Sequence, residues 1–324
     1  MKLSIVIPVY NEEESLTQLH KEISEVAESN EQDIEIIFID DGSRDNSWQV
    51  VQELSQTDSR IRAIKFRRNF GKAAALNAGF EAARGEIVMT MDADLQDDPH
   101  EIPAFLAQLQ DENLDVISGW KQVRHDPWHK VIPSRFFNAM VSYMTGVKLH
   151  DHNCGMKCYR REIFNEVVLY GELHRFVPVL AAARGYRVGE KIVEHRARQF
   201  GHSKYGFTRF VKGFLDLFTV WFLTAYGQRP QHLLGTIGLI AMTLGLTILT
   251  YLATMWVGSR MLNLAGLCDP INISERFPAV MYSIAALLLG GQFLSVGVIA
   301  ELIVANKNRS GKQYSIAEEI NKEN

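Results

Sequence analysis

LSIVIPVYNEEESLTQLHKEISEVAESNEQDIEIIFIDDGS, residues 3–43 of the 324-residue chain, contains the pattern that sets the fold class. It opens with an apolar run over residues 3–9, rich in Ile and Val, and a second such run covers residues 34–39. Between the two runs, apolar side chains recur at helical spacing, at Leu16, Leu19, Ile23 and Val26. The order strand, helix, strand is typical of an α/β fold.

The same alternation continues downstream. Strands are predicted over residues 61–66, 86–91 and 115–119, and helices over residues 72–83 and 99–110. This alternation predicts a mostly parallel sheet with helices on both faces, and in such sheets ligands bind beyond the carboxyl ends of the strands. The second strand ends at Asp40-Asp41 and the fourth at Asp92-Ala93-Asp94, so we expect both acidic groups at one rim of the sheet.

Composition excludes some classes of function. The net charge of -4 and the isoelectric point near 6.2 give no basic bias, so no nucleic-acid partner is predicted. The three cysteines, Cys154, Cys158 and Cys268, are odd in number and far apart, which favours a reducing compartment over a disulfide framework. The first residues lack the pattern of a signal peptide, so we expect the N-terminal domain to stay in the cytoplasm.

Two C-terminal stretches are long enough to cross a membrane. Residues 233–257 and 279–305 carry almost no charge, and about 25 residues of helix span a hydrocarbon core of roughly 30 Å. Lys and Arg are frequent before the first stretch and after the second, whereas the loop at 258–278 carries only Arg260 and Arg276. Because basic residues favour the cytoplasmic side, we predict a multi-pass protein of the cytoplasmic (inner) membrane with both termini inside.

The predicted organisation has four parts. Residues 1–200 form a cytoplasmic catalytic domain, 201–230 form amphipathic helices, 231–306 hold the two transmembrane helices, and 307–324 form a cytoplasmic tail. In the second part, aromatic and aliphatic residues alternate with basic ones, which favours helices lying at the membrane interface; packing of an ordinary amphipathic helix on the domain is the alternative. A homo-oligomer is possible through small residues of the membrane helices, namely Gly238, Gly245, Gly290 and Gly291.

Asp-x-Asp at a strand end suits a hard divalent cation, Mg²⁺ or Mn²⁺, because these ions prefer carboxylate oxygens and complete their shell with substrate phosphate. Taken alone, Asp92-Ala93-Asp94 is weak support, since such tripeptides are common in turns. Asp40-Asp41-Gly42-Ser43 could equally be a turn in which Asp45 caps the next helix. The two motifs become informative together, because both end strands of one sheet and both precede helices.

Six stretches carry a resemblance to a known family, and they lie in the family's order: residues 5–12 (IVIPVYNE), 40–45 (DDGSRD), 68–72 (RNFGK), 91–99 (MDADLQDDP), 174–176 (HRF) and 201–206 (GHSKYG). The chain resembles the family 2 inverting glycosyltransferases of the GT-A fold. Within that family it is similar to the polyprenyl-phosphate glycosyltransferases, of the dolichol-phosphate mannose synthase and bactoprenol glucosyltransferase type. This resemblance implies a GT-A domain followed by interfacial and membrane helices.

The resemblance also implies roles for individual residues. The nucleotide-sugar pocket is expected to include Pro8, Tyr10, Glu12, Asp41, Lys72 and Asp92. The metal and the reacting diphosphate are expected near Asp92, Asp94 and Gln96, with Asp94 as the main metal ligand. Candidates for the acceptor phosphate are Lys121, Arg124, Lys130, Ser134 and Arg135, although the family often has Arg where Lys121 stands. Candidates for closing over the diphosphate are Arg196, Arg198 and Lys204.

The implied reaction is transfer of a hexose, with inversion, from a nucleoside diphosphate sugar such as UDP-glucose to a polyprenyl phosphate. The product would serve cell-envelope glycan or lipid modification. A processive polysaccharide synthase shares the acidic motifs, but the Gln-x-x-Arg-Trp sequence of such enzymes is missing from the chain. An inactive transferase-fold scaffold is the third possibility. The presence of the whole acidic set argues against it, namely Asp41, Asp92, Asp94 and Gln96.

Overall fold

The computed structural model describes residues 2–123, 128–167, 171, 173–196, 208–267, 269 and 271–308, and gives no side-chain placement for 128–130, 208–212, 273, 307 and 308. The described chain divides into two compact units. The first runs to Thr224 and the second begins at Ala225. Each unit has its own packing.

The first unit contains a seven-stranded sheet with the order β3-β2-β1-β4-β6-β5-β7. Its strands are β1 (Leu3–Val9), β2 (Ile34–Asp40), β3 (Ile61–Lys65), β4 (Ile87–Thr90), β5 (Val116–Trp120), β6 (Lys157–Arg160) and β7 (Val188–Ile192). Only β6 among them runs antiparallel to its neighbours, β4 and β5. The carboxyl ends of the other six strands therefore share one rim with the amino end of β6.

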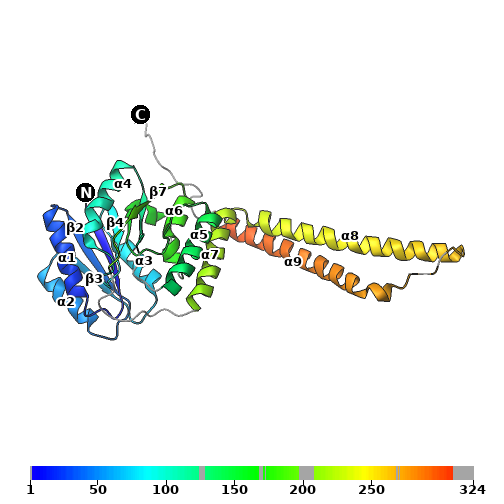
Figure 1. Ribbon diagram of the computed structural model, residues 1–324, viewed down its shortest axis with the longest axis horizontal. Helices are drawn as coiled ribbons and strands as arrows, with labels where there is room; N and C mark the ends of the chain where they lie inside the picture. Colours follow the sequence, from blue (N-terminus) through cyan, green and yellow to red (C-terminus); the bar gives the residue numbers. More distant parts are fainter. Residues whose placement is uncertain are drawn as a thin grey trace, which may run out of the picture. The chain divides into compact units, whose positions relative to one another are not determined.

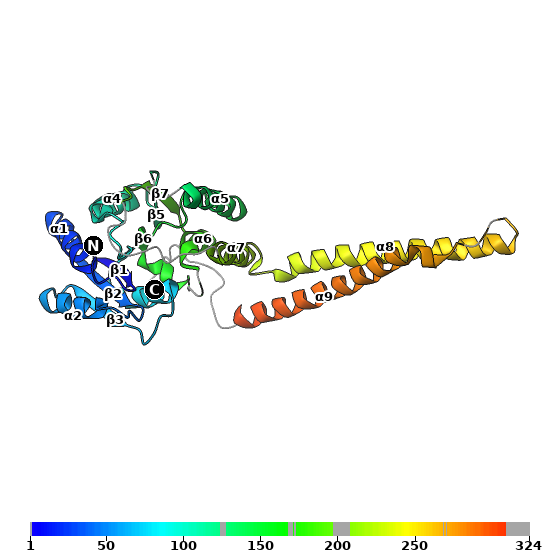
Figure 2. The same ribbon diagram turned by 60° about the horizontal axis from the view of Figure 1, so that its bottom comes forward.

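Helices cover both faces of this sheet (Figures 1 and 2). One face is covered by α1 (Leu16–Ser29), α2 (Ser47–Thr57) and α4 (Ile102–Asp111), which follows the short helix η1 (Pro99–Glu101). The other face is covered by α3 (Lys72–Ala82), η2 (Arg161–Asn165) and α6 (Val177–Ala182). A third cluster joins α5 (Trp128–Thr145), η3 (Leu173–Phe176) and α7 (Thr208–Tyr226).

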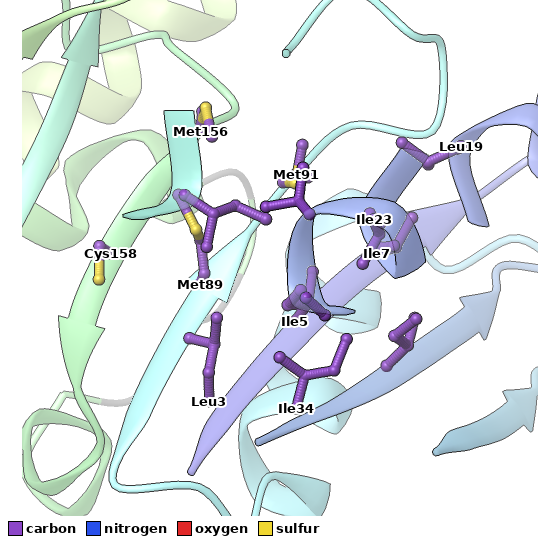
Figure 3. Packing of buried hydrophobic residues seen from close by; sticks show 14 of the residues in the cluster. Leu3, Ile5, Ile7, Leu19, Ile23, Ile34, Met89, Met91, Met156 and Cys158 are labelled. Carbon is purple, nitrogen blue, oxygen red and sulfur yellow. The ribbon is translucent and has the colours of Figure 1, made fainter. Parts of the chain in front are cut away.

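Alternation along β1 fills both cores. Ile5 and Ile7 point to the α1 face, where Figure 3 shows them beside Leu19 and Ile23, whereas Val6 points to the α3 face. Each such side chain, fully buried, contributes about 1.5–3 kcal/mol of transfer free energy. Because helices cover both faces of the sheet, the central strands are buried on both sides and their sequences are continuous apolar runs.

The five predicted strands and the mostly parallel sheet are confirmed, with no strand boundary shifted by more than one residue. The sequence did not predict β6 and β7. Strand β6 is four residues long and contains Lys157 and Arg160, so it lacks the apolar run on which strand prediction relies.

In the predicted interfacial segment, α7 buries Leu217 and Val220 against Phe137 and Val141 of α5. Its other side leaves Phe214, Leu215 and Phe218 exposed. Residues 201–207 lie outside the described chain. Packing of the helix on the domain is thus observed, and its contact with a membrane stays a prediction.

The second unit consists of two long helices, α8 (Pro230–Leu264) and α9 (Phe277–Asn308), which pack along each other, with η4 (Ile273–Arg276) before α9. Both are apolar and long enough to cross a membrane, and little of their most apolar windows is buried, unlike in the core helix of a soluble protein. Gly238 and Gly290 let the two backbones approach closely. Glu301 accepts a hydrogen bond from the amide of Gln231 (3.3 Å). Its carboxylate therefore provides a partner for one of the first amides of α8, which have none within the helix.

Candidate active site

The acidic turn, residues 91–98, follows β4 at the carboxyl rim of the sheet. The amide of Gln96 donates to Asp94 Oδ1 (3.3 Å), and the amide of Asp92 donates to Asp97 Oδ2 (3.3 Å). Leu95, at the centre of the turn, has φ of 59°, a left-handed conformation that is costly for a residue with a branched side chain. A backbone under such strain persists only where neighbouring contacts hold it.

Asp92 lies beside a basic residue from the next layer. It forms an ion pair with Lys72, the first residue of α3. Burial opposes ionisation of Asp92, but the ammonium groups of Lys72, Lys121 and Lys157 outweigh burial and lower its pKa to about 2. Asp92 is therefore a carboxylate throughout the physiological pH range.

Gly155, just before β6, touches Asp92 from the other side. A Cβ atom at position 155 would lie 2.6 Å from Asp92 Oδ2, so only glycine leaves room for the carboxylate as it is placed. The carbonyl of Gly155 also accepts from Thr90 Oγ1 (2.7 Å), which ties this loop to the end of β4. The sequence did not single out Gly155, because its importance depends on a contact with a residue distant in the chain.

Asp41 follows β2 at the same rim, as predicted. Its two carboxylate oxygens accept from the amides of Phe70 (2.7 Å) and Gly71 (3.0 Å), and burial raises its pKa. Asp41 therefore holds the loop that leads into Lys72. Strand β1 separates β2 from β4, so Asp41 and Asp92 start about 10 Å apart, two strand spacings.

The remaining residues predicted for the nucleotide lie at the end of β1. Pro8 is paired with Ile39 in the sheet, and the amide of Glu12 donates to Ser47 Oγ (2.8 Å). Tyr10 lies between them, partly buried. With Asp41 and Lys72 these residues share one rim, although they come from separate segments of the chain.

Two cations predicted for substrate phosphates already have carboxylate partners. Lys121, directly after β5, contacts Asp97 (2.8 Å), and Arg196, after β7, contacts Asp98 (2.8 Å) and Glu22 (2.6 Å). The side-chain amide of Gln96 lies 3.2 Å from His195 Nε2. Sequence reasoning missed Asp97 and His195, whose roles become visible only once β7 is placed beside β5.

The other residues predicted to bind substrate phosphates are only partly described. Ser134 and Arg135 lie on α5, near the exposed apolar side chains of Ile132 and Phe136. Arg124, Arg198 and Lys204 lie outside the described residues, as does the side chain of Lys130. Cys154 and Cys158 are free thiols, and both are buried.

The donor set at the acidic turn fits a hard divalent cation. Among the described residues no three His, Cys, Asp or Glu side chains form a ready-made metal cage. Asp92 and Asp94 offer oxygen ligands from one turn, and Asp94 is about 9% exposed. Mg²⁺ and Mn²⁺ bind through one or two carboxylates together with substrate phosphates, so an incomplete protein shell suits them.

Known sequences resemble the chain over most of its length. The profile described as glycosyl transferase family 2 matches residues 4–168. The dodecaprenyl-phosphate galacturonate synthase of Rhizobium johnstonii is 37% identical over 307 residues, covering 94% of this chain and 88% of its own. The undecaprenyl-phosphate 4-deoxy-4-formamido-L-arabinose transferase of Proteus mirabilis is 33% identical, covering 97% and 93%.

Among solved structures, the glucosyl-3-phosphoglycerate synthase of Mycobacterium tuberculosis has a similar fold. Its complex with Mn²⁺, uridine diphosphate and phosphoglyceric acid aligns with a TM-score of 0.54 at 16% identity, over 69% of this chain and 78% of that one. At this identity the likeness shows a shared fold, and the predicted GT-A fold is confirmed.

Proposed function

This chain belongs to glycosyl transferase family 2, and from that premise we propose that it transfers a sugar from a nucleoside diphosphate donor to a polyprenyl phosphate, with inversion at the anomeric carbon and with a divalent cation. The chain's family and its relatives make it a glycosyltransferase related to polyprenyl-phosphate transferases. The acceptor is proposed because both relatives are named for transfer to a polyprenyl phosphate and match almost the whole chain, membrane helices included.

One observation carries the proposal: two carboxylates of a single turn, Asp92 and Asp94, lie at the rim shared by Asp41 and Lys72. A nucleotide along the ends of β1 and β2 would direct its diphosphate toward this turn. A cation held there by Asp94 and Asp92, with Gln96 beside it, would take up the negative charge that develops on the leaving diphosphate.

The acceptor's chemistry sets the task of the remaining residues. A polyprenyl phosphate is already an anion at neutral pH, so attack on the anomeric carbon needs no general base. The protein must instead bring two anionic groups together in line, which requires cations and fixed geometry. Ser134 and Arg135 on α5, with Arg124 and Lys130, are proposed for the acceptor phosphate; Arg198 and Lys204 are proposed to close over the diphosphate.

The donor sugar is the component of the proposed reaction that the sequence and the relatives constrain least. Sequence reasoning favoured UDP-glucose, whereas the relatives are named for galacturonate and for 4-deoxy-4-formamido-L-arabinose. The donor is therefore proposed to be a UDP-sugar. UDP-glucose, UDP-galacturonate and a UDP-4-amino sugar are the ones to compare first.

Both termini and the catalytic domain are proposed to lie in the cytoplasm, with the loop between the membrane helices outside. Cys268 in that loop provides a test, since Cys154 and Cys158 are buried. A membrane-impermeant thiol reagent should label intact cells through Cys268, and Cys268→Ser should remove the label. If Cys268 were labelled only in broken cells, the loop would lie in the cytoplasm and the proposed orientation would be wrong.

The function is tested with purified enzyme, each labelled donor, undecaprenyl phosphate and Mn²⁺, followed by lipid extraction. The proposal predicts a labelled, acid-labile sugar lipid whose formation stops with EDTA and whose anomeric configuration, read by NMR, is inverted. Insoluble polymer would point to a processive synthase. No transfer with any donor would point to a scaffold.

A further inference from the structure

We infer that Lys121 and Arg196 act as positioning residues that fix the acidic turn, through Asp97 and Asp98, and do not bind substrate phosphates. The inference rests on the proposed function, in which this turn holds the cation. Lys121 and Arg196, which the sequence predicted as phosphate ligands, are thereby assigned a supporting role.

Lys121 fixes the turn from the β5 side. Its ammonium group lies 2.8 Å from Asp97 Oδ1, and the two side chains are 14% and 1% exposed. The other oxygen of Asp97 accepts from the amide of Asp92. The chain of contacts thus runs from the end of β5 to the backbone of the first metal-site carboxylate. Burial opposes the charge of Lys121, but nearby negative groups, chiefly the carboxylate of Asp97, outweigh burial and raise the pKa of Lys121.

Arg196 fixes the turn from the β7 side. One guanidinium nitrogen contacts Asp98 (2.8 Å) and another contacts Glu22 of α1 (2.6 Å). Its backbone amide donates to the carbonyl of Gln96 (3.1 Å). The backbones of His195 and Asp97 pair in an isolated antiparallel β-bridge. Both the side chain and the backbone of Arg196 are thereby committed to the turn and to α1.

The turn requires such support because its backbone is strained at Leu95. Asp98 also caps η1 by accepting from the amide of His100 (2.9 Å), so the end of the turn is fixed to the helix that follows. Contacts from β5, from the segment after β7 and from η1 therefore hold residues 92–98. A cation bound by Asp94 would gain from this support, because the ligands need not reorganise on binding.

The test compares Lys121→Met, Arg196→Met and Asp97→Asn in full-length enzyme, with the donor that supports transfer in the wild type. Arg187→Met is the matched control, since Arg187 forms an ion pair with Asp115 at the opposite end of β7. For each protein, kcat, the KM for undecaprenyl phosphate and the Mn²⁺ concentration giving half-maximal rate are measured, together with the melting temperature.

A positioning role predicts that all three test variants lose kcat or Mn²⁺ affinity by about 10- to 100-fold, the usual cost of removing support behind a metal ligand. The KM for undecaprenyl phosphate should stay within about twofold, because no phosphate contact is removed. Lys121→Arg should restore Mn²⁺ affinity. The control should resemble the wild type.

Two results would overturn the inference. The first is a large rise in acceptor KM for Lys121→Met or Arg196→Met with normal Mn²⁺ dependence, which would make them phosphate ligands. The second is normal kinetics in Asp97→Asn, which also decides the matter if the methionine variants do not fold. Absence of transfer by the wild-type enzyme would instead refute the proposed function.

Discussion

The carboxylate of Asp92 is confined by two residues distant in sequence, Lys72 and Gly155. The ion pair sets its charge, and the missing side chain at position 155 sets its place. For a carboxylate proposed to bind a metal, position matters more than stability, because a carboxylate can turn aside at small energetic cost while a metal site tolerates little displacement.

Replacing Gly155 by alanine tests this confinement. The new methyl group would lie 2.6 Å from Asp92 Oδ2 and would push the carboxylate away. We expect kcat to fall about tenfold or more while the melting temperature changes little, since the atom displaced is the end of a side chain. Gly258→Ala, at a glycine with nothing within 4 Å, is the control. Unchanged kcat in Gly155→Ala would show that the placement of Asp92 is not critical.

His152 predicts a pH dependence of stability. It is buried against Ser142 (3.0 Å), and burial, with the nearby Lys157, lowers its pKa from 6.5 to about 4. Between these values the unfolded chain binds a proton that the folded chain does not, so stability falls as the pH drops from 6.5 toward 4, by at most about 3 kcal/mol. Below pH 4 both states are protonated and this loss is complete.

The measurement is the free energy of unfolding at pH 7 and pH 5 for wild type, His152→Gln and the exposed-site control His232→Gln. His152→Gln should reduce the difference between the two pH values, and the control should not. An identical pH dependence in all three proteins would contradict the assignment.

At the scale of elements, the residues that set the sheet could be predicted because they form local patterns. The runs at 3–9 and 34–39 and the helical spacing between them require no partner to be recognised. Asp41 and Asp94 could be placed at one rim for the same reason, since parallel strands end together. The support by Lys121 and Arg196 depends on which strands lie side by side, and short β6 with its charged ends gave no signal of its place between β4 and β5.

The helix pair α8 and α9 depends on close backbone approach. A Cβ at Gly238 would lie 2.8 Å from the carbonyl oxygen of Gly290, so Gly238→Val should separate the helices. We expect a lower yield of folded protein in membranes and a melting temperature in detergent lowered by several degrees. Gly258→Val, in the same helix with open space around it, should behave like the wild type. Equal stability of the two variants would remove the argument for tight packing at Gly238.

At the scale of the whole molecule, each of the two units matches one requirement of the proposed reaction. The first brings the acidic turn, Asp41 and Lys72 to one rim, and the second offers helices long enough to cross a membrane, where a polyprenyl phosphate resides. The relatives named for polyprenyl-phosphate transfer match the chain over both units. We propose that sugar transfer at this rim depends on a cation bound by Asp94.

Transfer of labelled sugar to undecaprenyl phosphate by Asp94→Asn, compared with the wild type across a Mn²⁺ titration, tests that claim most directly. Asparagine keeps the size of the side chain and can still accept a hydrogen bond from Gln96, so the fold should survive. We expect a folded, membrane-bound variant whose transfer is lost at every Mn²⁺ concentration. Wild-type rates from Asp94→Asn would contradict the account.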